Sequence, residues 1–285
     1  MKVLLTGGTG FIGSAVLARL IEGGHTVEAV VRNDDAARRV ISAGAAAHVH
    51  DLTDVEWLSG LLRTVDAAIH TAAPSDGSNA AFDDAVIDAV ISAFSGTDKP
   101  FVHTGGIWSY GSGTDITEAT PNNAPALTAW RQQRETRILV SPVTAAVIAP
   151  ALVYGDGGGI PALVADSPTR DGAWLAIGTG EQHWTTVHRA DLADLYVLVL
   201  EQRGEGTFIA ASGDNPTVAE LTAAASGGLP IAAEGAEASR GRLGEAFADA
   251  LMLDQQATGA LARATFGWVP SRRPLVEELG AGAAR

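Results

Sequence analysis

A glycine-rich segment near the first residue constrains the fold of this chain more than any other feature. Residues 6–13 read Thr-Gly-Gly-Thr-Gly-Phe-Ile-Gly, between a short apolar run and a helical pattern of apolar residues. A buried strand, a glycine turn and an amphipathic helix form the setting of a dinucleotide-binding site. Gly7 permits a tight turn, Gly10 lets the backbone approach a pyrophosphate, and Gly13 lets the helix lie close to the sheet. The helix N-terminus then offers free N–H groups to phosphates, although a purely structural turn is the alternative.

Composition excludes several classes of function. The chain has 285 residues, 46% of them hydrophobic, which is enough for a sizeable core, and a net charge of −14 without any basic stripe. Nucleic acid is therefore not expected as a partner. The absence of cysteine excludes a disulfide framework and a thiol nucleophile. No apolar run reaches membrane-spanning length, and a first strand at Lys2 leaves no room for a signal peptide, so we expect a cytoplasmic protein without a membrane partner.

Short apolar runs alternate with helical patterns through the first half of the chain. The runs that we interpret as strands are Val3–Leu5, Val27–Val31, Ala46–Val49, Ala67–Ile69, Phe101–Val102 and Val143–Ile148. The helical patterns between them are Gly10–Glu22, Asp34–Ala43, Val55–Leu62, Phe82–Phe94 and Leu127–Leu139. Several runs are apolar throughout, as in parallel strands that are buried on both faces. This order predicts an α/β fold with a doubly wound parallel sheet, the Rossmann fold.

The alternation ends after Tyr154. Beyond it we expect a flexible loop at 155–159, a strand and loop over a pocket at 172–185, a helix at 192–200 that Asp191 caps, and a strand at 207–210. A helix at 221–225 should follow a Thr217/Glu220 capping box, and then a loop-rich segment at 227–244 and a helix at 245–265. We therefore expect a dinucleotide-binding domain at 1–154 plus 186–212, and a smaller substrate-binding lobe at 155–185 plus 213–285. The sequence does not determine the oligomeric state.

The end of the second strand indicates which nicotinamide cofactor fits. An NAD site usually has an acidic residue there for the ribose 2′-OH, whereas this strand ends in Arg32 and Asn33. A guanidinium can pair with a 2′-phosphate, so we expect NADPH/NADP+ as the cofactor, with a solvated arginine as the alternative. Arg38 or Arg39, about one turn further on, is a candidate to assist.

The ends of the third and fourth strands supply further candidates. Asp51, followed by Leu52, could meet the adenine amino group, or could be the N-cap of a helix. Small residues at 71–73 would let the ribose and pyrophosphate lie on the backbone. His70 is expected to be a packed histidine at a strand end. No His/Asp/Glu cluster has metal-ligand spacing, so no metal is expected.

These segments together resemble the extended and atypical short-chain dehydrogenases/reductases, the epimerase/dehydratase-like proteins that bind NAD(P). The glycine segment matches their fingerprint, and matches follow in the family's order at 149–155 (Ala-Pro-Ala-Leu-Val-Tyr-Gly), 186–193 (Thr-Val-His-Arg-Ala-Asp-Leu-Ala) and 266–270 (Phe-Gly-Trp-Val-Pro). The resemblance spans nearly the whole chain. It implies that residues 150–153 line the nicotinamide and that the C-terminal lobe binds substrate.

The motifs and the resemblance together define two sets of candidate residues. Those expected to bind the cofactor are Gly7, Thr9, Gly10, Phe11, Ile12, Gly13, Arg32, Asn33, Asp51, Leu52, Thr71, Ala72, Ala73, Thr104, Pro150, Leu152 and Val153. Those expected to bind substrate are Gly106, Ile107, Trp108, Trp130, Tyr154, His183 and Trp184.

The catalytic positions depart from the family pattern. Gly106 stands where the family has its active-site Ser or Thr, and Trp130 and Arg134 stand where it has a Tyr-x-x-x-Lys pair. An indole N–H does not ionise usefully and a guanidinium stays charged, so neither side chain replaces the tyrosine acid. Arg134 could hold the ribose or stabilise an alkoxide, while Trp130 could stack on a flat substrate or simply pack beside the cofactor.

Another group must then supply the proton for carbonyl reduction. No catalytic residue is secure: the candidates are Thr104, Ser109, Trp130 and Arg134, and the side chains that could supply a proton also include Tyr110, Tyr154 and His183. Bound water is a second source, and a substrate phenol, with a pKa of roughly 10, is a third.

We consider three functions in view of these departures. The first is an NADPH-dependent ketoreductase for a bulky aromatic ketone of the polyketide type, as in an atypical subgroup of the family that lacks the usual active-site residues. The second is a non-catalytic NADP(H)-sensing regulatory protein. A nucleotide-sugar epimerase or dehydratase is disfavoured, because those reactions need the tyrosine base.

Overall fold

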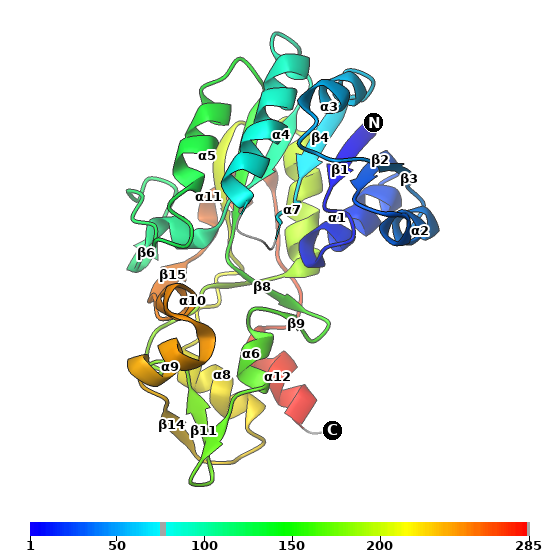
Figure 1. Cartoon of the computed structure of the whole chain (residues 1–285). Helices are drawn as coiled ribbons and strands as arrows, with labels where there is room; N and C mark the ends of the chain where they lie inside the picture. Colours follow the sequence, from blue (N-terminus) through cyan, green and yellow to red (C-terminus); the bar gives the residue numbers. More distant parts are fainter. Residues whose placement is uncertain (75–77, 284–285) are drawn as a thin grey trace.

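A seven-stranded parallel sheet forms the centre of the larger part of the molecule in the computed structural model, which describes residues 1–74 and 78–283 (Figure 1). Its strands, in spatial order, are β13 (Gly206–Ala210), β7 (Ala145–Pro150), β5 (Phe101–Thr104), β4 (Ala67–His70), β1 (Lys2–Thr6), β2 (Thr26–Val31) and β3 (Ala46–Val49). The chain builds one half of the sheet from β1 outward to β3 and then the other half from β4 outward. The point where the order reverses, between β1 and β4, is where such sheets bind ligands.

Helices cover both faces of this sheet. On one face lie α1 (Phe11–Glu22), α2 (Asp34–Ser42), α7 (Arg189–Glu201) and the short α11 (Ala260–Phe266), and on the other lie α3 (Val55–Leu62), α4 (Asn79–Phe94) and α5 (Arg131–Leu139). Successive strand residues face opposite sides, so Leu5 joins the core under α1 and Leu4 joins the core under α3 and α4. The doubly wound α/β fold expected from the sequence is confirmed.

A smaller lobe at the lower end of Figure 1 follows the carboxyl ends of the strands. Two small sheets lie outside the main one: β12 (Thr186–His188), β8 (Leu152–Gly155) and β9 (Gly158–Gly159) form the first, and β15 (Gln255–Ala257) with β6 (Gly113–Ile116) forms the second. The lobe also has a sheet of β10 (Thr169–Arg170), β11 (Ala173–Ala176) and β14 (Ile231–Ala233). Its helices are α6 (Ala162–Ala165), α8 (Val218–Ala225), α9 (Ala236–Leu243), α10 (Glu245–Leu251) and α12 (Leu275–Ala283), and the 3₁₀ turn η1 (Ile107–Tyr110) follows β5. A separate core that includes Trp184 and Leu221 holds the lobe together.

The prediction of one helix at 245–265 is wrong. The chain instead forms α10, the strand β15 and α11, because β15 pairs with β6 and Gly259 adopts a left-handed conformation with φ +66°. A Cβ on Gly259 would lie 2.6 Å from the carbonyl oxygen of Ala211, so a continuous helix does not fit there. The segment at 227–244, expected to be loop-rich, contains β14 and α9.

Two helix starts also differ from expectation. The helix expected at 127–139 begins at Arg131, after a turn at 126–130. The helix expected behind Asp191 begins at Arg189, where the ring of His188 accepts a hydrogen bond from the N–H of Ala190. Asp191 instead accepts hydrogen bonds from the N–H groups of residues 271 and 272, so it ties α7 to the C-terminal segment.

The Thr217/Glu220 capping box is confirmed at the start of α8. Within residues 1–74 and 78–283, no helix has the length and apolar character that crossing a membrane requires.

Candidate active site

A cavity of about 1060 Å³ lies at the carboxyl ends of β1, β2, β4 and β5. All of the residues for which a cofactor contact is expected line it, from the glycine segment through Arg32, Asp51, Thr71 and Thr104 to Val153. Gly159 and Ile160 of the smaller lobe line it as well. The motifs therefore converge on one space, large enough for a dinucleotide.

The glycine turn has the shape that a pyrophosphate needs. Gly7 has φ +75° and its carbonyl accepts the N–H of Gly10 at 2.8 Å. A Cβ on Gly13 would overlap the carbonyl oxygen of Gly7 and lie 2.6 Å from Oγ1 of Thr71, so only glycine lets α1 pack so close. No side chain caps the N-terminus of α1. The free N–H groups and the bare turn fit a phosphate.

The end of β2 presents positive charge to the cavity. Arg32 is exposed at the rim, and Arg39 of α2 lines the cavity beside it. Arg38 pairs instead with Asp35 and is not among the lining residues. Asn33 accepts a hydrogen bond from the N–H of Ala36 at 2.9 Å and so is the N-cap of α2.

Asp51 is an exposed carboxylate at the end of the cavity near β3. Hydrogen bonds from Thr53 lower its pKa, so it is ionised at neutral pH. The N-cap of α3 is Asp54, which accepts from the N–H of Trp57 at 3.1 Å, so the interpretation of Asp51 as that cap is wrong. Its carboxylate remains available to an adenine amino group.

The structure places Arg131, rather than Arg134, at the cavity. Arg134 donates to the Asp84 carboxylate at 2.6 Å and to two backbone carbonyls, and neither it nor Trp130 is among the lining residues. Arg131 lines the cavity and donates to the carbonyl of Thr104 at 3.0 Å. The cavity lining therefore does not favour the ribose contact expected of Arg134, which Asp84 of α4 holds, or the substrate stacking expected of Trp130.

Two hydroxyl groups face the same region. Thr104 Oγ1 donates to the carbonyl of His70 at 2.7 Å and lies 2.6 Å from the hydroxyl of Tyr196. Thr128, which the sequence reasoning missed, also lines the cavity, and its buried Oγ1 has no hydrogen-bond partner among the described residues. A buried hydroxyl without a partner is the kind of group that a ligand satisfies.

The expected substrate residues divide into two groups. Gly106, Ile107 and Trp108 line the cavity. Besides Trp130, three of them lie outside the cavity lining and make contacts within the protein: the Tyr154 hydroxyl donates to the carbonyl of residue 273 at 2.8 Å, the Trp184 indole donates to that of residue 251 at 2.8 Å, and His183 pairs with residue 254 at 2.8 Å. Substrate contact by these three stays a prediction, which their place outside the cavity lining does not favour.

Proton donation by the two tyrosines is also disfavoured. Burial, assisted by nearby carboxylates, raises the pKa of Tyr110 and of Tyr154, so both hydroxyls are weaker acids than an ordinary tyrosine. Ser109 is buried and lines a smaller neighbouring cavity rather than the main one.

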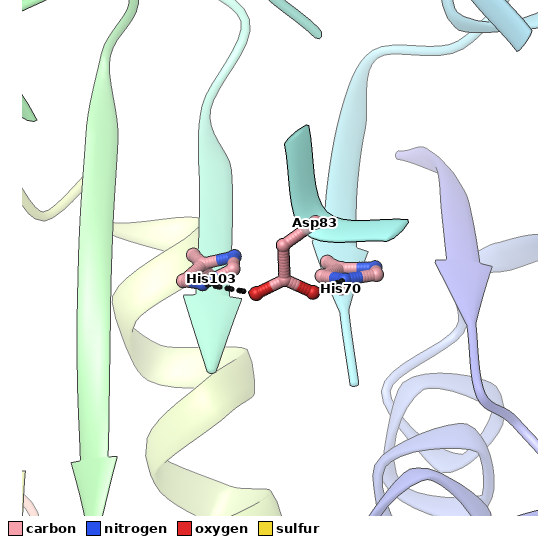
Figure 2. Close-up of side chains that lie close together, drawn as sticks. All are labelled: His70, Asp83 and His103. Atoms are coloured by element: carbon pink, nitrogen blue, oxygen red, sulfur yellow. Dashed lines mark hydrogen bonds and ion pairs between the residues drawn. The ribbon is translucent and has the colours of Figure 1, made fainter. Parts of the chain in front are cut away.

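Figure 2 shows a buried cluster that spacing along the chain did not reveal. His70 ends β4, His103 lies on β5, and Asp83 of α4 sits between their rings, with the ligating atoms of all three within 4.8 Å of one another. Asp83 Oδ1 lies 3.3 Å from His70 Nε2, and Oδ2 lies 3.5 Å from His103 Nε2. The other ring nitrogen of His70 lies 2.7 Å from Oγ1 of Thr6. The carboxylate thus bridges two imidazoles behind the cavity wall.

The charges of this cluster follow from burial. Burial lowers the pKa of His103 to about 3, with the charges of His70 and Arg131 acting in the same direction and Asp83 opposing them. Burial would raise the pKa of Asp83, but the hydrogen bond and charge of His70, with His103 and Arg131, hold it below its ordinary value. The cluster at neutral pH therefore holds an ionised Asp83 beside a neutral His103.

A protein-family model described as the NAD dependent epimerase/dehydratase family matches residues 3–210. An uncharacterized protein of Schizosaccharomyces pombe is 28% identical over 99% of both chains. An uncharacterized protein of Saccharomyces cerevisiae is 33% identical over 72% of both. Two partial matches have reductase names: vestitone reductase of Medicago sativa (32% identical, 26% of each chain) and a 4-hydroxy-2-methyl-3-oxo-4-farnesyl-3,4-dihydroquinoline-1-oxide ketoreductase of Stigmatella aurantiaca (34% identical, 26% of this chain and 22% of that one).

Solved structures share the fold across the whole chain. A human epimerase family protein with NADPH superimposes with a TM-score of 0.77 at 20% identity, covering 100% of both chains. UDP-glucose 4-epimerase of Thermotoga maritima, solved with UDP-glucose, superimposes with a TM-score of 0.75 at 19% identity, covering 100% of this chain and 98% of that one.

Proposed function

The chain belongs to the NAD dependent epimerase/dehydratase family, and from that premise we propose that it is an NADPH-dependent ketoreductase acting on a bulky aromatic ketone with a phenol beside the carbonyl. The single observation that carries the proposal is the 1060 Å³ cavity, which the dinucleotide motif and the segment at 106–108 line together. An aromatic polyketide of the angucyclinone kind is the substrate class that we propose to test first.

The charge at the end of β2 favours NADPH over NADH. Arg32 and Arg39 both line the cavity where the 2′-phosphate of NADPH would lie, and no acidic residue ends that strand. Among the structural relatives, the human protein was solved with NADPH and a Thermus thermophilus UDP-glucose 4-epimerase with NAD. Because proteins of this fold bind either NADPH or NAD, the proposal of NADPH depends on the two arginines.

The residues of this chain have distinct parts in the proposed reaction. Bound NADPH would supply the hydride. The turn at Gly7 and the N-terminus of α1 would hold its pyrophosphate, and Arg131 and Thr128, which line the same cavity, would meet the nicotinamide ribose or the ketone oxygen. The guanidinium of Arg131 would stabilise a developing alkoxide.

The proton would come from the substrate phenol or from water. The tyrosine-lysine pair of the family is replaced by Trp130 and Arg134, and both side chains lie outside the cavity lining. A phenol next to the carbonyl has a pKa of roughly 10, like the missing tyrosine, and is held beside the oxygen by the substrate itself. The Stigmatella ketoreductase name describes a ketone at position 3 with a hydroxyl on the neighbouring ring atom, although that hydroxyl is a tertiary alcohol and not a phenol.

We propose the division into a dinucleotide-binding domain and a substrate-binding lobe that the sequence suggests. Residues 1–154 and 186–212 would bind the dinucleotide, and residues 155–185 and 213–285, of which 284–285 lie outside the described chain, would form the substrate lobe. Gly159 and Ile160 are residues of that lobe that line the cavity.

A deuteride-transfer experiment tests this function. The protein is incubated with NADPH deuterated at the transferring position of C4 and with two ketones, a polycyclic ketone bearing a phenol beside the carbonyl and its O-methyl ether. We expect a deuterium-labelled secondary alcohol from the phenol and a rate at least about tenfold lower for the ether, the usual scale of a lost positioned acid. Equal rates would rule out protonation by the substrate.

The second candidate function is a non-catalytic NADP(H)-sensing regulator. The displacement of Arg134 from the cavity is the observation that favours it. NADPH binding together with no deuterium in any product across a panel of aromatic ketones would favour the regulator and overturn the reductase.

A further inference from the structure

A second cavity of about 250 Å³ lies behind the wall formed by Gly105 and Gly106. It shares Gly106 with the main cavity, and polar side chains dominate its lining, among them Ser109, Glu118 and Glu135. At about 30 Å³ per molecule, the space is large enough for several waters.

Two residues that line this second cavity each carry a buried polar atom without a protein partner. Oε1 of Glu135 and Oγ of Ser109 make no hydrogen bond within the described residues. An unsatisfied buried polar group is costly, so water is the natural partner for both. Water in the second cavity would therefore lie beside both side chains.

Gly105, which has no side chain, lies between Glu135 and the main cavity. A Cβ on Gly105 would lie 2.8 Å from Oε1 of Glu135, and Gly105 itself lines the main cavity. Gly106 has open space where its Cβ would be. The carboxyl therefore lies directly behind the part of the wall where the family places its active-site hydroxyl.

The surroundings of Glu135 favour its protonated form. Burial raises the pKa of its carboxyl, and the charge of Asp83 on α4 adds to that effect. The charge of Arg131, which is on α5 together with Glu135, opposes it. Tyr110 and Glu118, from the segment after β5, also face the second cavity. Burial raises the pKa of Tyr110 too, so its hydroxyl stays neutral. A carboxyl whose pKa is raised keeps its proton to a higher pH than an ordinary glutamate and is better suited to donate one.

We propose that Glu135 supplies the proton for the ketone oxygen through water held in the second cavity. The inference rests on the reductase proposed above and identifies the origin of its water-borne proton. As hydride from NADPH bonds to the carbonyl carbon, the C–O π pair moves to oxygen, which bonds a proton from a water at Gly106. That water takes a proton along the chain of waters, the O–H bond of Glu135 breaks, and solvent reprotonates the carboxylate before the next turnover. Glu135 is a positioning residue, since it acts through water.

The first arm of the test measures the carboxyl itself. The wild type, labelled with carboxyl-¹³C glutamate, is titrated by NMR beside Glu135→Gln. We expect one signal that titrates at higher pH than those of the exposed glutamates and that disappears in the variant. A Glu135 signal that titrates with the exposed glutamates overturns this inference and leaves the reductase proposal standing.

The second arm measures turnover of the O-methyl ether, which lacks its own phenol. We expect Glu135→Gln to lower kcat for the ether about tenfold or more with NADPH affinity unchanged, and to abolish the fall in rate as pH rises through the carboxyl titration. Glu135→Asp should restore that pH dependence, and Glu237→Gln, at an exposed position on α9, is the matched control. A wild-type kcat and pH profile in Glu135→Gln overturns the inference, whereas a wild type that transfers no deuteride overturns the reductase itself.

Discussion

At the scale of single residues, the buried imidazole of His103 makes the stability of this chain depend on pH. Its pKa is lowered by burial to about 3 in the folded chain and is about 6.5 in an unfolded one. Between these values the unfolded state binds a proton that the folded state does not bind. The stabilisation is therefore complete above about pH 6.5 and is lost progressively as the pH falls toward 3.

We expect the free energy of unfolding to fall by about 2 kcal/mol between pH 7.5 and pH 5 on account of His103. His103→Asn should be less stable than the parent at pH 7.5 and should lose less stability on acidification. Urea denaturation at a series of pH values measures both effects, with His50→Asn, at a histidine outside the cluster, as the matched control. An unchanged pH slope in His103→Asn would contradict this account of the buried ring.

The positions of residues at the cavity were predictable where they depend on contiguous sequence. The glycine segment and Arg32 line the cavity because local geometry alone brings a strand end and a helix start together. Arg131 was missed because the position of α5 depends on a turn at 126–130, and because Asp84 on another helix holds Arg134. The pairing of His70 with His103 had a readable signal, since both lie at or next to the ends of neighbouring parallel strands and are opposite each other in the register.

At the scale of elements, the contact between the glycine turn and α1 depends on one missing side chain. We expect Gly13→Ala to destabilise the fold by about 1–3 kcal/mol, the usual cost of overpacking, because its Cβ would overlap the carbonyl of Gly7. NADPH affinity should fall as well, since the turn must shift. Thermal unfolding and fluorescence titration with NADPH measure the two effects.

Gly60 on α3 provides the matched control for this substitution. Nothing lies within 4 Å of a Cβ at Gly60, so Gly60→Ala should keep NADPH affinity and gain about 0.5–1 kcal/mol of stability from helix propensity. Wild-type affinity in Gly13→Ala would show that the turn does not hold the pyrophosphate.

Elements of the first half were predictable because each strand and helix has its own apolar pattern. The segment at 245–265 was not, because its helical periodicity continues across β15, whose strand conformation comes from pairing with β6. Such pairing joins residues 113–116 to 255–257, and no local pattern encodes a partner so far along the chain.

At the scale of the whole molecule, a strongly acidic chain is proposed to bind an anionic cofactor. The net charge of −14 opposes the approach of a dinucleotide phosphate. Binding must therefore depend on local charge, which Arg32, Arg39 and the N-terminus of α1 place around the cavity. We propose that this local arrangement, more than the fold, distinguishes NADPH from NADH.

Calorimetric titration of NADPH and NADH into the parent, Arg32→Ala and Arg38→Ala tests this claim most directly. We predict one NADPH per chain, bound at least about tenfold more tightly than NADH, as expected for a charge-assisted phosphate contact. Arg32→Ala should remove the preference, and Arg38→Ala should keep it, because Arg38 pairs with Asp35 outside the cavity lining. Equal affinity of the parent for both cofactors, or no binding of either, would contradict the account.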